Sequence, residues 1–205
     1  MSNANTTTYR YLKYYSVVHR LFKQGVPNVT SHNLASLCNV TASQLRKDIM
    51  NLSIQGTNKV GYQVSALLAE LTQHVNNKSI SVVLVGAGSL GTALLNYKNF
   101  KKHGFDIKAA FDINSNIGEK NEVKVLHIDH CSNFILKNNI KMAILTVPES
   151  VAQHTAKLLV DAGIDKILNL TPAILSLTPD VTVSNVNLVF ELEYLLLNSA
   201  AGSLK

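Results

Sequence analysis

The sequence has little that would anchor the chain in a membrane or stabilise it outside a cell. Its 205 residues include two cysteines, Cys38 and Cys131, which are too few for a disulfide framework and too far apart for a Cys-x-x-Cys pair. No apolar run approaches the roughly 18 to 20 residues that a membrane-spanning helix needs. The polar residues 1–8 lack the apolar segment of a signal peptide. We therefore expect a cytoplasmic protein with reduced thiols, Cys38 among them as a core residue, and no membrane partner.

The sequence also lacks any grouping of side chains that suggests catalysis. It shows no Ser-His-Asp, Cys-His or paired-carboxylate arrangement. His127 and His130 flank Asp129, but no further metal ligands accompany them, and Asp129 is typical of a helix N-cap. We predict neither a catalytic residue nor a metal site.

Charge of one sign is concentrated at one end of the chain. The formal net charge is +6, and residues 1–78 hold eight basic side chains against two acidic ones. The other 127 residues hold eleven of each sign. A positive field confined to one segment favours a polyanionic partner for that segment, although a small domain can also be basic by chance.

Residues 1–78 have the pattern of a winged helix-turn-helix domain. We expect helices over 9–24 and 33–38 and a third helix that starts at a capping box. In that box the Thr41 hydroxyl accepts from the Gln44 N–H, and the Gln44 side chain reaches back. Residues 54–64, with a turn at 56–58, predict a hairpin. The residues expected to face inward are Leu12, Tyr15, Val18, Leu21 and Phe22, then Leu34, Leu37 and Cys38, then Leu45, Ile49 and Leu52.

The third helix is expected to present its polar face to DNA. Helical spacing turns Ser43, Gln44, Arg46 and Lys47 outward. An arginine can bond guanine O6 and N7, and a glutamine can pair with adenine. The alternative is an ordinary solvated helix face, which the charge excess and the predicted hairpin disfavour. We predict double-stranded DNA as the partner of this segment.

Residues 79–186 alternate apolar strands with helices, which is typical of a doubly wound parallel sheet of the Rossmann type. A boundary falls near residues 75–79, where a helical pattern stops and a solid apolar run begins. The expected strands are 80–85, 107–111, 123–126, 142–147, 166–170 and 181–184, and the expected helices are 89–102, one from about 129, and 148–162.

The loop after the first of these strands has the spacing of a dinucleotide-binding site. Gly86, Gly88 and Gly91 form a G-x-G-x-x-G motif, and Asp112 ends the next strand 21 residues after Gly91. In this motif the glycines permit a tight turn, the approach of a pyrophosphate and close helix–sheet packing. Asp112 would accept from ribose hydroxyls and repel a 2′-phosphate. We therefore predict NAD (NADH/NAD⁺) as the cofactor; the alternative is a glycine turn without a ligand.

Residues 187–198 predict a last helix that is apolar almost all round, with Glu191 and Glu193 as its acidic residues. Such a helix has to be buried on several sides, and one small sheet cannot cover it. We expect a second subunit to do so. The predicted organisation is a DNA-binding domain at 1–78, a cofactor domain at 79–186, and a dimerisation helix and tail at 187–205.

Taken together, these motifs resemble those of the Rex family of redox-sensing transcriptional repressors. The resemblance runs from Arg10 to about Tyr194. It rests on the segments 40–49, 60–62, 85–91, 97–98, 110–112, 147–148, 162–164, 168–169, 185–188 and 191–192. It implies a homodimer that exchanges its last helix, binds an inverted-repeat operator and releases it when NADH binds.

The expected site residues follow from the motifs and the resemblance. Several positions depart from the family. Among them, Thr57-Asn58 stands where the family's wing has a Lys-Arg pair, and Asn187 stands where the family has an aspartate. We expect cofactor contacts from Gly86, Ala87, Gly88, Ser89, Leu90, Gly91, Tyr97, Asp112, Ile113, Thr146, Val147 and Pro148. We expect DNA contacts from Arg10, Ser43, Gln44, Arg46, Lys47 and Lys59, and coupling between the two ligands through Arg10, Tyr97 and Asn187.

Two rival interpretations assume the same fold for residues 79–186. A small NAD-dependent dehydrogenase with a basic appendage would need a substrate domain and a proton donor, for which the sequence offers no space. A ligase-like subunit that binds a nucleotide or coenzyme A would leave the helix-turn-helix unexplained.

Overall fold

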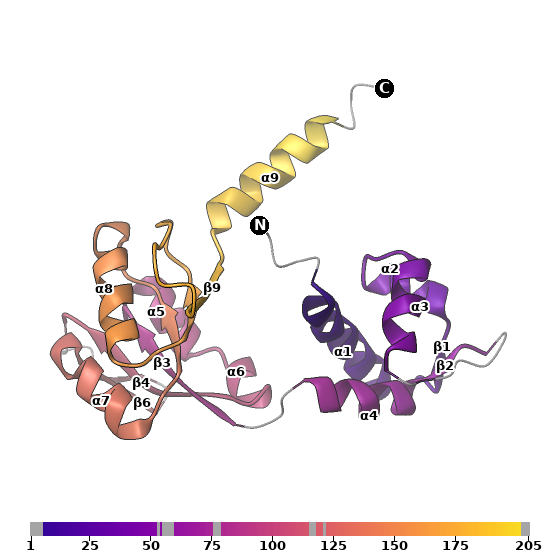
Figure 1. Cartoon of the computed structure of the whole chain (residues 1–205), viewed down its shortest axis with the longest axis horizontal. Coiled ribbons are helices and arrows are strands. Elements are labelled where there is room, and N and C mark those ends of the chain that lie inside the picture. Colours follow the sequence, from indigo (N-terminus) through magenta and orange to yellow (C-terminus); the bar gives the residue numbers. More distant parts are fainter. Residues whose placement is uncertain are drawn as a thin grey trace. The chain divides into compact units, whose positions relative to one another are not determined.

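The computed structural model describes residues 6–52, 54, 60–75, 79–114, 118–120 and 122–201 (Figure 1). The chain divides into two compact units, Met1–Lys78 and Ser79–Lys205. One hydrophobic core lies in the first unit, and two lie in the second.

The described part of the first unit contains a helix-turn-helix. Its helices are α1 (Thr7–Lys23), α2 (Ser31–Leu37), α3 (Ala42–Met50) and α4 (Val64–His74). Strands β1 (Asn28–Val29) and β2 (Tyr62–Gln63) pair antiparallel. The side chains of Thr6, Thr30 and Thr41 each accept from the N–H three residues on, which satisfies donors that have no partner within the helix. These three caps explain where α1, α2 and α3 begin.

The buried face of α1 differs from the predicted one. Tyr14 is fully buried, whereas Leu12 and Phe22 are about half exposed. The predictions for Leu12 and Phe22 were wrong because they followed apolar spacing alone, whereas a polar contact also holds this helix: the Tyr14 hydroxyl donates to the Asp48 carboxylate at 2.8 Å. Tyr15 is partly buried and packs against the core. Leu37 is also exposed, against expectation. The inward positions of Val18, Leu21, Leu34, Cys38, Leu45, Ile49 and Leu52 are confirmed.

The predicted hairpin is only partly covered by the structure. Its turn at 56–58 and Lys59 lie outside the described residues. Its last strand, β2, pairs with β1, which follows α1 in the sequence. The helical pattern that ends before the boundary corresponds to α4.

The second unit is a Rossmann sheet, as predicted. Its parallel strands are β3 (Ile80–Val85), β4 (Phe105–Asp112), β6 (Val123–His127), β7 (Met142–Leu145), β8 (Lys166–Asn169) and β9 (Thr182–Asn185). They lie in the order β6-β4-β3-β7-β8-β9, and β5 (Glu119–Lys120) adds an antiparallel edge. The strand order reverses at β3, where ligands of such sheets bind outside the carboxyl ends of the strands.

Helices cover both faces of this sheet. They are α5 (Ser89–Leu95), α6 (Asn99–Lys102), the 3₁₀ turn η3 (Ile128–His130), α7 (Cys131–Asn138) and α8 (Glu149–Asp161). Val83 and Val85 of β3 belong to the core shared with α7 and α8, whereas Val82 and Leu84 belong to the core shared with α5. Burial on both faces explains why β3 is an unbroken apolar run.

The predicted helix 89–102 is two helices instead of one. α5 ends at Leu95 and α6 begins at Asn99. The Asn96 side chain donates to the Thr92 carbonyl at 3.0 Å. Such local side-chain bonds compete with helix propagation, which accounts for the break.

The last helix, α9 (Leu188–Ala201), projects away from the sheet in Figure 1. Its large apolar side chains are exposed, from 57% at Tyr194 to 71% at Leu197. This is the expected profile of a helix whose cover comes from another chain.

Candidate functional site

Three glycines shape the loop between β3 and α5. Gly86 has a φ of +100°, and a Cβ there would lie 2.7 Å from the backbone of Thr146. A Cβ at Gly91 would lie 1.9 Å from the Gly86 carbonyl oxygen. A Cβ at Gly88 would meet nothing within 4 Å. Two glycines therefore let the loop lie against β7 and α5, and the third leaves open space on its outer side.

Side chains from the neighbouring strands hold this loop. Asp112 Oδ2, at the end of β4, accepts from the Ala87 N–H at 2.6 Å, and its Oδ1 accepts from the Asn114 N–H at 2.9 Å. The Thr146 hydroxyl, just after β7, lies 2.6 Å from the Gly86 carbonyl oxygen, to which it donates. The structure thus brings Asp112 and Thr146 to the glycine loop from both sides.

The other predicted cofactor residues take different places. Ala87 is buried in the loop, while Ser89 and Leu90 begin α5 and are exposed. Val147 and the exposed Pro148 connect β7 to α8. Ile113 is 81% exposed beside Asp112, which is unusual for an isoleucine and leaves an apolar surface next to the loop.

Tyr97 is not brought to the glycine loop. It follows α5, whose seven residues extend for about 10 Å, so it lies at the other end of that helix. Its ring packs edge-on against Phe100, with centroids 5.2 Å apart. Its role as a cofactor contact stays a prediction.

The outer face of α3 is polar, but the side chains of two of its predicted DNA contacts, Gln44 and Arg46, already form hydrogen bonds within the first unit. Ser43, Arg46 and Lys47 are exposed, and Arg46 Nη1 donates to the Ser31 hydroxyl at 3.3 Å. The Gln44 N–H donates to the Thr41 hydroxyl as predicted. The Gln44 side chain does not reach back to Thr41, the cap residue, because Gln44 Nε2 donates to Asp48 Oδ1 at 2.8 Å.

Asp48 is the centre of a polar cluster that sequence reasoning missed. Arg10 Nε donates to Asp48 Oδ2 at 2.6 Å and Arg10 Nη2 to Oδ1 at 2.9 Å. Tyr14 and Gln44 donate to the same carboxylate, and the Tyr11 hydroxyl donates to the Asp48 carbonyl at 3.1 Å. The side chains of Arg10 and Asp48 are 14% and 4% exposed. This cluster attaches α1 to the inner side of α3.

The cluster keeps its charges. Burial alone would raise the pKa of Asp48, but hydrogen bonds from Arg10, Tyr14 and Gln44 outweigh it and hold the pKa below its ordinary value. The hydrogen bond to Asp48 in turn raises the pKa of Arg10. The one sequence signal was position: Asp48 lies three residues after Leu45 and directly before Ile49, on the face that turns inward.

Asn187 and Asn169 shape the start of α9. Asn187 Oδ1 accepts from the N–H groups of Val189 and Phe190 at 3.0 and 3.2 Å, so Asn187 caps the helix. The buried Asn169 Nδ2 donates to the Asn185 side chain at 2.8 Å, and the Val186 N–H donates to the Asn169 carbonyl at 2.9 Å. These contacts fix the chain that leads from β9 into α9.

Both thiols are buried and unreactive in character. Burial raises the pKa of Cys38 to about 11 and that of Cys131 to about 12. A thiol of this kind stays protonated at neutral pH, and the thiolate is the reactive form. The core role predicted for Cys38 is therefore confirmed.

Within the part of the chain that the structure describes, no group of three His, Cys, Asp or Glu side chains could hold a metal ion. None of the helices described is long and apolar enough to cross a membrane.

Known families match both units. Residues 4–49 match the family described as "Putative DNA-binding protein N-terminus", and residues 77–173 match the one described as "CoA binding domain". The redox-sensing transcriptional repressor Rex of Thermoanaerobacter sp. is 38% identical over 179 residues, which covers 86% of this chain and 80% of that relative. Rex of Carboxydothermus hydrogenoformans is 38% identical over 188 residues, 90% of each chain.

Solved structures of a Rex-family repressor also match this chain. RSP, described as a Rex-family repressor, is 34% identical in two of its complexes. Bound to beta-NAD+ and operator DNA, it matches with a TM-score of 0.83 over 97% of both chains. Bound to beta-NADH, it matches with a TM-score of 0.84 over 100% of this chain and 99% of RSP. The resemblance seen in the sequence motifs is thereby confirmed, and the chain belongs to the Rex family of redox-sensing transcriptional repressors.

Proposed function

We propose that this protein is a repressor that binds operator DNA through its first unit and is released when NADH binds to its second. The observation that carries the proposal is the presence, in one chain, of a helix-turn-helix and a glycine loop with an acidic residue at the end of the next strand. RSP, the Rex-family relative, has been solved with NAD+ and operator DNA together and with NADH.

The residues around the glycine loop fit a dinucleotide. The open space at Gly88 admits a pyrophosphate to the backbone, and Gly91 keeps α5 close to the sheet. Asp112 is held at the loop by the Ala87 N–H and can still accept from ribose hydroxyls. Ile113, Thr146, Val147 and Pro148 would border the rest of the cofactor. The nicotinamide supplies the redox state that the protein senses.

The exposed residues of α3 are the proposed DNA contacts. Ser43, Arg46 and Lys47 are presented to solvent, and Lys59 would add a contact from the wing. Gln44 would read a base only if its amide left Asp48, so we assign it a positioning role while that hydrogen bond lasts. The partner is an inverted-repeat operator bound by a homodimer.

Coupling between the two ligands is proposed to run through Arg10, Tyr97 and Asn187. Arg10 is held by a two-point ion pair with Asp48, so any other acceptor has to compete with that carboxylate. Asn187 offers an amide oxygen that already caps α9. A hydrogen bond from Arg10 to Asn187 would still involve one charged group, but it would not pair charge with charge as an aspartate does. The loss is therefore expected at the low end, about 1 kcal/mol or several-fold in affinity, and we expect weaker coupling than in relatives with an aspartate.

The experiment is a gel shift on promoter fragments in the apo, NAD⁺ and NADH forms. We expect NADH to release the fragment and NAD⁺ to leave it bound. Binding should weaken steeply with salt, by about 0.9 log units per log unit of salt for each phosphate neutralised. Equal binding in all three forms would contradict the proposed function.

Asp112→Ala is expected to weaken NADH binding and to erode the preference for NADH over NADPH. The carboxylate accepts from the ribose, repels a 2′-phosphate and holds the Ala87 N–H. We expect an effect of the order of 10-fold or more on NADH, since a charged hydrogen bond contributes about 1.5–3 kcal/mol. Isothermal titration with both cofactors measures this. Unchanged affinities would mean that Asp112 only closes the loop.

Deleting residues 187–205 is expected to give monomers that no longer bind the operator. The deletion removes α9, whose apolar side chains are exposed in the single chain and are proposed to be exchanged between subunits. Sedimentation of the truncated protein at several concentrations measures the assembly. A stable dimer would place the subunit interface elsewhere.

The family is one of transcriptional regulators, and we further propose that this chain binds its cofactor without turning it over. The rival dehydrogenase predicts consumption of NADH in the presence of an oxidised substrate. A constant NADH absorbance during operator release supports sensing alone.

A further inference from the structure

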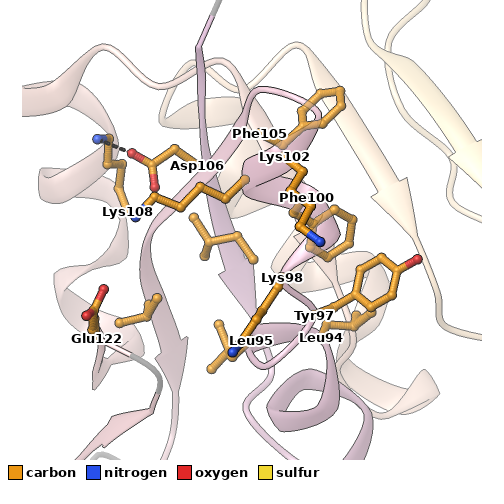
Figure 2. Close-up of a pocket in the computed structure, with 13 residues that line it drawn as sticks. Leu94, Leu95, Tyr97, Lys98, Phe100, Lys102, Phe105, Asp106, Lys108 and Glu122 are labelled. Atoms are coloured by element: carbon orange, nitrogen blue, oxygen red, sulfur yellow. Dashed lines mark hydrogen bonds and ion pairs between the residues drawn. The ribbon is translucent and has the colours of Figure 1, made fainter. Parts of the chain in front are cut away.

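A cavity of about 670 Å³ opens at the end of the second unit's sheet that lies opposite the glycine loop (Figure 2). It is lined by the first residues of β4, the start of β6, the end of α5 and the short helix α6. The glycine loop follows the last residue of β3, and β3 runs parallel to β4. A ligand here would therefore not occupy the dinucleotide site.

The floor of this cavity is apolar. Leu94, Phe105 and Ile107 are half-buried there and pack on the core shared with α5. A volume of this size falls within the roughly 300–1,000 Å³ range of small-molecule sites, which are mostly apolar with a few polar groups. The cavity can therefore accept the body of an organic molecule.

The rim is basic. Lys98, Lys101, Lys102 and Lys108 line the cavity together with two acids, Asp106 and Glu122. Lys108 is paired with Asp106 at 2.5 Å (Figure 2). Over the described residues, no ion pair within 4.0 Å involves any of the other three lysines. Four lysines against two acids give the lining a net charge of +2, which favours an anionic ligand.

An aromatic pair borders the same opening. Tyr97 is half exposed, and its ring meets that of Phe100 at 78° (Figure 2). The exposed ring offers a surface on which a nucleobase can stack, as bases do on aromatic side chains of single-strand binding proteins. Lysines provide compact charges that suit phosphate oxygens.

We propose that this cavity is a second ligand site, for a nucleoside polyphosphate. Its phosphates lie among Lys98, Lys101 and Lys102, and its base lies against Tyr97 and the apolar floor. Of the residues predicted for the cofactor or for coupling, the cavity lining includes only Tyr97; the glycine loop lies outside it, so both ligands can bind at once. This inference goes beyond the proposed function, which needs only NADH and DNA.

The test is isothermal titration of ATP into the full-length protein saturated with NADH. We expect one ATP per chain, both with and without NADH. Lys98→Glu combined with Lys102→Glu should weaken ATP binding at least 10-fold. Lys137→Glu, an exposed lysine on α7 outside the cavity lining, should leave it within twofold. The milder pair Lys98→Gln and Lys102→Gln repeats the test if the double glutamate variant is misfolded.

Three results would overturn the proposal. Loss of ATP binding when NADH is saturating would place ATP in the glycine loop. Inorganic tripolyphosphate that binds as tightly as ATP would show that no base is recognised. No binding of ATP to the dimer would show that the cavity is closed or filled in the assembly. NADH titration into the double lysine variant should match the wild type; if NADH fails to bind the wild type, the proposed function fails separately.

Discussion

Gly91→Ala is expected to give a repressor that binds its operator but no longer responds to NADH. The added Cβ would lie 1.9 Å from the Gly86 carbonyl oxygen, and 3.2 Å from Leu84 Cδ2 in the core below. The first of these is backbone and cannot rotate away, so α5 has to move off the sheet and the loop loses its shape. Overpacking of this kind costs about 1–3 kcal/mol of stability. We expect NADH affinity to fall by the order of 100-fold.

Gly88→Ala is the matched control. Its Cβ would meet nothing within 4 Å in the protein, so the melting temperature should not change. It would still occupy the space through which a pyrophosphate reaches the backbone, and NADH affinity should fall. Isothermal titration with NADH, thermal melts and operator binding separate the two variants. If Gly91→Ala binds NADH normally, the loop does not form the cofactor site.

Asp48→Ala is expected to loosen α3 and to lower operator affinity by at least 10-fold. The carboxylate accepts from Arg10, Tyr14 and Gln44, so its removal leaves the almost buried charge of Arg10 without its counter-ion and takes away the carboxylate to which the buried Tyr14 hydroxyl donates. The hydrogen bond from Arg10 to the Thr7 hydroxyl remains. Breaking one side of a buried pair costs about 3–5 kcal/mol. Three kcal/mol correspond to more than a 100-fold rise in amide exchange, at about 1.4 kcal/mol per factor of ten. Amide hydrogen exchange of α1 and α3, followed in the full chain, measures this loosening.

Asp165→Ala is the control for this variant. Its carboxylate lies 2.6 Å from Lys166 Nζ, the same distance as in the Arg10–Asp48 pair, but both side chains are about half exposed. Exposed pairs contribute at most about 1 kcal/mol, so exchange should hardly change. A similar small effect of Asp48→Ala would mean that α3 is held by its apolar contacts alone.

Acid is expected to weaken the polar cluster around Asp48. Because the pKa of Asp48 is lowered in the folded protein, its stabilising contribution is present above the pKa of the unfolded chain, about 3.9. It is lost as the pH falls through the folded value. The difference in exchange between the wild type and Asp48→Ala should therefore narrow below about pH 4.

The features that sequence reasoning located well are those encoded locally. The threonine caps act within three residues of themselves, and the G-x-G-x-x-G spacing lies between one strand and the next helix. The unbroken apolar run of β3 reflects burial on both faces. Each is visible in a short window, because propensity, capping and periodicity depend on near neighbours.

The features that it missed depend on contacts between distant segments. Asp48 meets Arg10 and Tyr14 across 38 and 34 positions, and that contact decides which face of α1 is buried and where the Gln44 amide points. The lysine-rimmed cavity combines the end of α5, α6 and the first residues of β4 and β6.

The sequence by itself determined the two folds, the glycine loop and the acidic residue at the end of the next strand, because each of these depends on a local pattern. Only the tertiary structure decided that Arg10 is held by Asp48, that Tyr14 is buried while Leu12 is exposed, and that the second cavity exists. A polar side chain has several possible acceptors, and packing selects among them.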